Sequence, residues 1–151
     1  MRRIVSVMLV IALCISGMTI NAKGIEVDGE ITTRFADGGY IIESVTENSA
    51  RLTGSKSGYK SYKYYESNGK MAWCVDIFGN FVYTGATSTC IASNISVSVY
   101  DTAWAEIARN SSESGNSAVG QVTMGRYALG ALVESKTVNL RLTCDANGNL
   151  S

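Results

Sequence analysis

Histidine and proline are both absent from this chain of 151 residues, and each absence excludes something. Histidine is the usual general base, triad member and zinc ligand, so its absence excludes many classes of enzyme and metalloprotein. Without proline there is no Pro-rich linker, and the turns must be built from glycine, asparagine and serine. The sequence carries no nucleotide-binding, metal-binding or catalytic motif, so we predict that the protein uses no cofactor and no metal.

Charge is scarce in the first 22 residues, where Arg2 and Arg3 precede an uncharged run of 17 residues from Ile4 to Ile20. A basic start, an apolar run and a small residue such as Ala22 at the cut are typical of a secretory signal peptide. A transmembrane anchor is the alternative, but it needs about 20 apolar residues, and polar residues dilute this shorter run. We therefore predict a signal peptide over residues 1–22, a secreted protein and no stable membrane span after cleavage.

The chain has no excess of basic residues once the signal peptide is removed. The remaining 11 basic and 13 acidic side chains give a net charge of −2. Nucleic-acid binding depends on a basic stripe that displaces counterions from phosphates, so we predict no nucleic-acid partner. The length that remains suits a single domain. Residues 23–47 are acidic and show no sustained periodicity, so we expect a loosely ordered leader there and one domain over residues 48–151.

The clearest structural signal is Asn68-Gly69, the dipeptide that most strongly indicates a β-hairpin turn. A two-residue loop at this point fixes the register of the strands on either side. Four pairs then face each other: Tyr64 with Trp73, Tyr62 with Val75, Lys63 with Cys74 and Ser61 with Asp76. We expect the first two pairs to face the core and the other two, which are mostly polar, to face solvent.

The rest of the chain after Arg51 has the composition of short strands separated by small turn residues. Apolar residues alternate from Trp73 to Tyr83, so we expect this strand to continue through Gly79 as a kink or bulge; a tight turn at Gly79-Asn80 is the alternative. Further strands are expected near residues 48–54, 87–92, 95–99, 102–109, 117–124, 126–133 and 138–144. We predict an all-β protein, an antiparallel, immunoglobulin-like β-sandwich of about eight or nine strands with Greek-key links.

Three cysteines remain after cleavage, Cys74, Cys90 and Cys144, in a compartment that permits oxidation. A turn at Gly79-Asn80 and a turn over residues 84–87 both fail to place Cys74 opposite Cys90, and Cys74 lies on the polar face of its strand. Cys144 continues the core-facing alternation of the strand before it. We therefore predict a disulfide between Cys90 and Cys144, worth about 4 kcal/mol by the chain-entropy model. Cys74 is then left as a surface thiol that is inert or pairs between molecules.

Tyrosines and lysines are interleaved between residues 56 and 65. Strand alternation sends Tyr62 and Tyr64 into the core and leaves Tyr59, Lys63 and Tyr65 on the outer face. These last three residues are our candidates for an aromatic and cationic surface that binds a cell-wall polymer or an extracellular protein.

Asp76, Asp101 and Glu106 are the carboxylates we consider for glycoside hydrolysis, which needs two carboxyl groups about 5–10 Å apart in a cleft. Nothing in the strand pattern brings them together, so we assign no catalytic residue. The C-terminal segment from Asp145 to Asn149 is spaced like the start of a calcium loop, but Leu150 stands where the turn glycine belongs. We expect a terminal turn there.

The segment from Tyr62 to Cys90 combines Tyr64-Tyr65, Ser67-Asn68-Gly69-Lys70, Ala72-Trp73 and a Gly79-x-Phe81-x-Tyr83-x-Gly85 ladder. Related features follow at Ser114-Gly-Asn116, Leu142-Thr-Cys144 and Asn147-Gly-Asn-Leu150. Over most of residues 60–151, these motifs resemble an uncharacterised family of small secreted β-sandwich proteins from Gram-positive bacteria. The resemblance implies secretion, a β-sandwich and a recurring cysteine pair at Cys90 and Cys144. It implies no activity, and Cys74 departs from it.

The leading functional hypothesis is a secreted, non-enzymatic protein that acts at or outside the cell envelope by contact with a polymer or a protein. The export signal and the lack of catalytic groups favour it. Two alternatives remain open, namely an antagonistic, toxin-like secreted protein and a histidine-free hydrolase that works with carboxylates.

Overall fold

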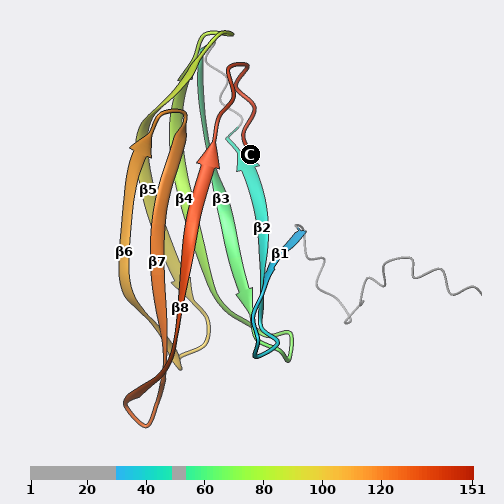
Figure 1. Cartoon of the computed structure of the whole chain (residues 1–151), viewed down its shortest axis with the longest axis vertical. Helices are drawn as coiled ribbons and strands as arrows, with labels where there is room; N and C mark the ends of the chain where they lie inside the picture. Colours follow the sequence, from blue (N-terminus) through green and yellow to red (C-terminus); the bar gives the residue numbers. More distant parts are fainter. Residues whose placement is uncertain (1–29, 49–53) are drawn as a thin grey trace, which may run out of the picture.

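The computed structural model describes residues 30–48 and 54–151 (Figure 1). The predicted signal peptide lies outside these residues, as does most of the strand expected near 48–54. The described part forms eight antiparallel strands and no helix, which confirms the prediction of an all-β protein. Since that part contains no helix, none of its segments meets the length and hydropathy of a helix that crosses a membrane.

The eight strands form two antiparallel sheets. The larger sheet contains, in spatial order, β1 (Glu30–Arg34), β2 (Tyr40–Glu47), β3 (Ser55–Tyr65), β4 (Met71–Tyr83) and β5 (Ser88–Val99). The smaller sheet contains β6 (Trp104–Ser114), β7 (Ser117–Ala128) and β8 (Ala131–Thr143).

Strand order differs from the expected immunoglobulin-like arrangement. Every hydrogen-bonded strand pair among the described residues joins strands that are consecutive in the chain. An immunoglobulin-like order with Greek-key links would instead pair strands that are distant in the chain. The expectation of Greek-key links is therefore wrong, because most connections are tight turns that return the chain directly onto the strand it has just left.

The hairpin between β3 and β4 has the predicted register, with Tyr64 opposite Trp73 and Tyr62 opposite Val75. Its turn is one residue longer than expected, since Glu66 N–H donates to the Lys70 carbonyl and Gly69 N–H to the Glu66 carbonyl, each at 2.9 Å. Gly69 has φ +80°, which is typical of a three-residue loop closed by a left-handed glycine. A bulge near Tyr65 absorbs the extra residue, so the register of the strands is the one predicted.

β4 continues through Gly79, as the alternation indicated, and no turn forms at Gly79-Asn80. The ring of Phe81 folds back over Gly79, so that a Cβ atom at residue 79 would lie 2.5 Å from Phe81 Cζ. Glycine is needed here because an aromatic ring approaches the backbone closely.

β1 and β2 belong to the larger sheet, which corrects the expectation of a loosely ordered leader for residues 30–47. The first part of the expected leader, residues 23–29, lies outside the described residues. Ile41 is only 2% exposed and is part of the core. The acidic residues of this segment, which favoured the prediction of a leader, fit within the sheet. Glu43, for example, lies 3.0 Å from the ammonium of Lys60.

The strand expected over residues 126–133 is instead the end of β7, a turn and the start of β8. The turn is made by Leu129 and Gly130, with φ +51° and +79°. The prediction failed because residues 126–133 are mostly apolar and contain only one glycine, a pattern that indicated one continuous strand. The strands expected over 87–92 and 95–99 are, conversely, one strand, β5. Figure 1 shows the β7–β8 hairpin extending beyond the rest of the molecule.

The inner faces of the two sheets pack against each other around one core (Figure 1). The alternation predicted its central members, which are Trp73, Val75, Ile77, Phe81, Val138, Leu140, Leu142 and Cys144. At one end of the core, Trp73 stacks on Tyr64 with ring centroids 4.8 Å apart, and Trp104 meets both rings edge-on.

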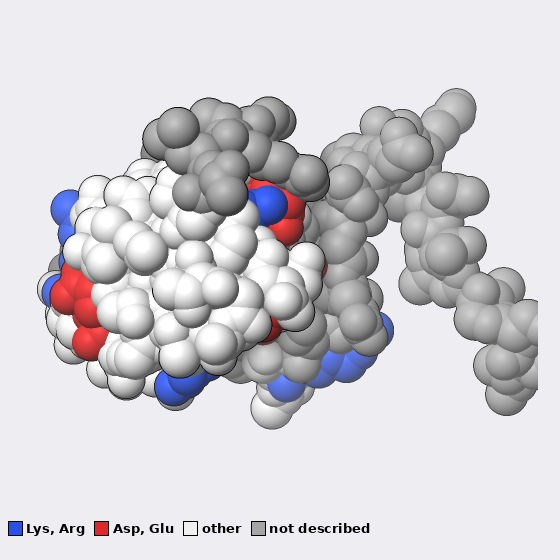
Figure 2. Space-filling model, turned by 90° about the horizontal axis from the view of Figure 1, so that it is seen from above, with Lys and Arg blue, Asp and Glu red and all other residues white. Residues whose placement is uncertain are grey.

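Figure 2 looks down on the end of the molecule opposite the β7–β8 hairpin. The charged side chains visible there lie around an uncharged centre, with several basic groups along the lower edge of the view.

Candidate binding site along the free edge of β8

β8 is an edge strand that pairs only with β7 among the described strands. At Arg141, the backbone N–H donates to the Tyr62 hydroxyl at 2.9 Å, and that hydroxyl lies 3.2 Å from the Arg141 carbonyl, to which it can donate. The backbone polar groups of Arg141 therefore point away from β7 and toward the larger sheet.

Thr137 and Asn139 have the same orientation as Arg141, because strand residues repeat with a period of two. Their side chains give independent support: Thr137 lies 3.0 Å from the Thr123 hydroxyl, and Asn139 accepts from Gln121 at 2.9 Å. Such close side-chain pairs are typical of cross-strand positions that exchange no backbone hydrogen bonds. The N–H and C=O groups of Thr137 and Asn139 thus face outward, and no described residue bonds them.

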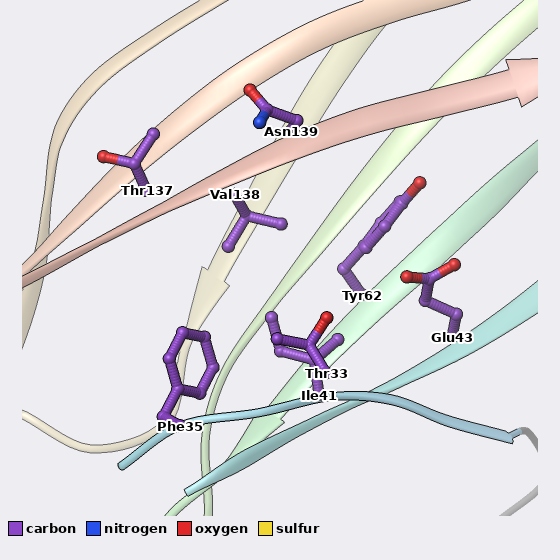
Figure 3. A pocket seen from close by; sticks show the side chains of 8 residues that line it. All are labelled: Thr33, Phe35, Ile41, Glu43, Tyr62, Thr137, Val138 and Asn139. Carbon is purple, nitrogen blue, oxygen red and sulfur yellow. The ribbon is translucent and has the colours of Figure 1, made fainter. Parts of the chain in front are cut away.

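A pocket of about 260 Å³ lies beside this free edge (Figure 3). Residues from two sheets line it, namely Thr33, Phe35, Ile41, Glu43, Tyr62, Thr137, Val138 and Asn139. Figure 3 shows the three β8 residues on one side and the residues of the larger sheet across from them. We call the open space between β8 and the β1–β3 side of the larger sheet the seam. Its walls are partly apolar, through Phe35, Ile41 and Val138, and partly polar.

Lys136 closes the seam at the end nearer the β1–β2 turn. Its ammonium lies 2.8 Å from Asp37 and 2.6 Å from Glu134, and it sits over the ring of Phe35 at 4.2 Å. The lysine therefore connects β8 to the β1–β2 turn, just as Tyr62 connects β8 to β3 at the other end. Between these two connections, the backbone edge at Thr137 and Asn139 stays open.

Electrostatics keep the Lys136 connection ionised. The hydrogen bond from Lys136, helped by the Gly39 N–H, lowers the pKa of Asp37 from 3.8 to about 2. Burial acts to lower the pKa of Lys136, but hydrogen bonds to Asp37 and Glu134 outweigh it and raise that pKa. Both partners are therefore charged across the whole neutral range.

Burial raises the pKa of Tyr62 to about 12, so its hydroxyl stays protonated at neutral pH. A protonated hydroxyl can accept from the Arg141 N–H and donate to the Arg141 carbonyl at the same time. Tyr62 thus occupies the hydrogen-bonding positions that an added strand would use at this end of β8.

The seam combines a free backbone edge with a small, partly apolar pocket. Its pocket contains one carboxylate, Glu43, which pairs with Lys60. Glycoside hydrolysis requires a second carboxyl group, and none lines this pocket. Over the described ranges, no group of three or more Cys, Asp or Glu side chains is arranged to hold a metal ion.

The predicted surface residues Tyr59, Lys63 and Tyr65 do lie together on the outer face of β3. Tyr65, however, is only 6% exposed, because its ring stacks on Tyr40 with centroids 5.3 Å apart. Tyr59 is half-buried beside Phe78. The expectation that Tyr65 is available to a ligand is thus wrong, since aromatic neighbours cover it.

Cys74 is also on the outer face but is 7% exposed, which corrects the expectation of a surface thiol. Burial, and then the nearby Asp76 carboxylate, raise the pKa of Cys74 to about 12. A thiol with so high a pKa is almost entirely protonated at neutral pH and is a poor nucleophile.

Cys90 and Cys144 lie in the core and are present as free thiols. Their backbones bind consecutive residues of the β6–β7 turn: Cys90 N–H donates to the Gly115 carbonyl at 2.8 Å, and Cys144 N–H to the Asn116 carbonyl at 3.0 Å. Burial raises the pKa of the Cys90 thiol, and the nearby Glu113 carboxylate acts in the same direction.

The three carboxylates considered for hydrolysis have separate partners. Asp76 accepts from Ser61, Asp101 pairs with Lys70, and Glu106 pairs with Arg109. None of the three lines the pocket beside β8.

The C-terminal segment forms the expected turn. Asp145 accepts from the backbone N–H groups of Asn147 and Asn149, at 2.8 and 2.9 Å, and Gly148 has φ +85°. The carboxylate thus organises its own loop, as an Asx-type turn does.

Comparison with known proteins finds no match for this chain among family models, curated proteins or solved structures. The site must therefore be interpreted from its own geometry.

Sequence reasoning did not identify the seam. Tyr62 and Val138 were predicted only as core residues, and Thr33 and Phe35 were assigned to the leader. The only sequence feature that pointed toward the seam was the alternation of polar residues in β8. This alternation predicts which side chains face outward, but it does not predict that the backbone edge of the strand is free.

Proposed function

We propose that this chain is a secreted β-sandwich protein without enzymatic activity, and that it binds an extended segment of an extracellular polypeptide along β8. The observation that carries the proposal is the pair of outward-facing, unbonded backbone positions at Thr137 and Asn139 beside a pocket. Secretion rests on the sequence pattern of residues 1–22.

An extended peptide fits this edge because its own N–H and C=O groups repeat every second residue, about 6.8 Å apart. Thr137 and Asn139 offer the complementary groups at the same spacing. Adding a strand to an exposed sheet edge is an established mode of peptide recognition, in which backbone bonds give affinity and side-chain pockets give specificity.

The open edge limits the length of the ligand. Tyr62 occupies the edge at Arg141, and the Lys136–Asp37 ion pair closes the other end. We expect about five residues of the ligand to be ordered between these connections.

The pocket favours one apolar side chain of that segment. Pockets for whole small molecules measure about 300–1,000 Å³, and this one is smaller, at about 260 Å³. Phe35, Ile41 and Val138 supply apolar contacts for such a side chain.

The proposal is tested with displayed peptides and two variants of residue 137. A library of random peptides is selected on the secreted form, residues 23–151, and a selected peptide is synthesised for calorimetry. Thr137→Pro removes the outward N–H but no bond to β7, and proline is tolerated at such edge positions. Both substitutions remove the contact of the Thr137 hydroxyl with Thr123, but Thr137→Val keeps the backbone N–H. Thr137→Val is therefore the matched control.

We expect the Kd to rise about tenfold or more in Thr137→Pro, which corresponds to one lost hydrogen bond, and less than about threefold in Thr137→Val. Bound peptide should also slow amide exchange at Thr137 and Asn139. Failure to select any peptide, or equal affinities in the two variants with both folded by circular dichroism, would contradict the proposal.

We also propose that Cys90 and Cys144 form a disulfide in the secreted protein. Their common place in the core and their bonds to adjacent residues of the β6–β7 turn support this pairing. Secretion would provide the oxidising compartment.

A further inference from the structure

A second surface, separate from the seam, lies at the β7–β8 hairpin. We define the hairpin tip patch as five exposed apolar side chains, Ile107, Tyr127, Leu129, Leu132 and Val133. Figure 1 shows the hairpin projecting past both sheets at the end opposite the C-terminus. Exposed apolar groups that cluster at a projection mark an interaction site more often than scattered ones do.

Leu129 is the apex of this patch, and its backbone is strained. It is fully exposed, at 108% relative to the reference state, and it is the one described non-glycine residue with positive φ, at +51°. Turns of this type favour Asn or Gly, because an L side chain with a Cβ atom is disfavoured there. The Leu129 side chain gains nothing from burial in the folded chain, so it is available for contact with another surface.

Tyr127, Leu132 and Ile107 lie close together below the apex. A bulge opposite Tyr127 places Leu132 across from Tyr127, on the outer face of the smaller sheet. Leu132 and Ile107 meet over Gly125, where a Cβ atom would lie 2.8 and 2.7 Å from their Cδ1 atoms. Glycine at residue 125 therefore lets these two side chains close over the sheet.

The hairpin tip carries no unpaired charge. Residues 127–133 contain no acidic or basic side chain. Arg126 and Glu134 flank them and lie 3.9 Å apart, and Glu134 also binds Lys136. The tip backbone is paired within the hairpin, with Tyr127 opposite Leu132 and Ala128 opposite Ala131. Moving the tip into an apolar environment would therefore leave few polar groups unsatisfied.

We propose that this hairpin docks the protein on the surface of a lipid bilayer, with Leu129 inserted deepest. A protein partner would cover one side of a narrow hairpin, whereas lipid can surround an apex that is exposed on every side. Tyr127 suits the headgroup level, because tyrosine combines an apolar ring with a polar hydroxyl. Because the tip has no charged side chain, burial of apolar surface, and not attraction to charged lipid, would drive its binding to the bilayer.

The test compares Leu129→Asn with Ile91→Asn in the secreted form, residues 23–151. Leu129→Asn removes the apolar apex and relieves the turn, so the variant should fold at least as well as the parent. Ile91, an apolar residue on β5 that is 60% exposed and lies outside the hairpin tip patch, provides the control. Binding to uncharged phosphatidylcholine vesicles is measured by co-sedimentation.

We expect Leu129→Asn to lower the partition coefficient about tenfold and Ile91→Asn to change it less than twofold. Binding should not depend on added salt. The proposal is overturned if the parent does not sediment with vesicles, if both variants lose binding equally, or if binding needs anionic lipid and disappears in salt. A dimer in ultracentrifugation that Leu129→Asn abolishes would assign the patch to a second copy of the chain and overturn it as well.

Discussion

Lys136 is a lysine that is 7% exposed at the end of an apolar core, and its neighbours explain how it remains charged. Two carboxylates bind its ammonium, and the rings of Phe35 and Tyr64 lie 4.2 and 5.3 Å from it. Burial alone would favour the neutral amine, but two charge-assisted hydrogen bonds outweigh that cost. The residue thus acts as a clamp at one end of the seam.

Asp37 should give this clamp a measurable pH dependence. Its folded pKa, about 2, lies below the ordinary 3.8, so its stabilising contribution is complete above about pH 4 and is lost as the pH falls through 2. Since 43% of the side chain is exposed, we expect a contribution of no more than about 1 kcal/mol.

Urea unfolding of the parent and Asp37→Asn between pH 7 and pH 2 checks this expectation. The variant should be less stable at pH 7, and the difference should shrink below about pH 4 and have lost most of its value at pH 2. A difference that stays constant over this range would show that the carboxylate charge is not what stabilises the clamp.

At the scale of strands, β4 is continuous because Gly79 leaves room for the ring of Phe81. A Cβ atom at residue 79 would lie 2.5 Å from the Phe81 ring and 3.3 Å from Ala118 Cβ. Phe81 has no exposed surface, so it cannot swing aside into solvent.

We therefore expect Gly79→Ala to destabilise the protein by about 1–3 kcal/mol through overpacking. This outweighs the gain of up to about 1 kcal/mol that reduced chain entropy gives to a Gly→Ala change. Asn80→Ala, at the exposed neighbouring position of β4, is the control and should stay within about 0.5 kcal/mol of the parent. A stabilised Gly79→Ala variant in denaturant unfolding would disprove the steric explanation.

Local sequence signals predicted the elements that depend on local chemistry. Asn68-Gly69 and the alternation on either side sufficed for the β3–β4 register, because a turn fixes the pairing of the strands it joins. β1 and β2 were missed because Tyr40, Ile41 and Ile42 are consecutive apolar residues that break the alternation. The seam was missed because Tyr62 and Arg141 are 79 residues apart, and only the packing of two sheets brings them together.

At the scale of the whole molecule, the two sheets meet differently along their two sides. Beside β5 and β6, the Arg109 guanidinium donates to the Ile95 carbonyl at 3.3 Å, so the edge of β5 is partly capped. Along the seam, the Tyr62 and Lys136 connections lie at the ends and leave the middle of β8 open. This difference is why we assign peptide binding to the seam.

The proposed disulfide would join the start of β5 in the larger sheet to the residue that follows β8 in the smaller one. It would close a loop of about 54 residues, for which the chain-entropy model allows about 4 kcal/mol. The backbone N–H groups of both cysteines bind consecutive residues of the β6–β7 turn, which holds the two cysteine backbones at the same end of the core.

Peptide mapping of the secreted protein without reductant should therefore find Cys90 linked to Cys144. Cys74 should be free and should react with iodoacetamide only after unfolding, because burial and its high pKa protect it. Cys74→Ala is the control and should leave the bridge intact. Reduction should lower the free energy of unfolding by about 2–4 kcal/mol. Linkage of Cys74 to either other cysteine, or three free thiols in the secreted protein, would rule the pairing out.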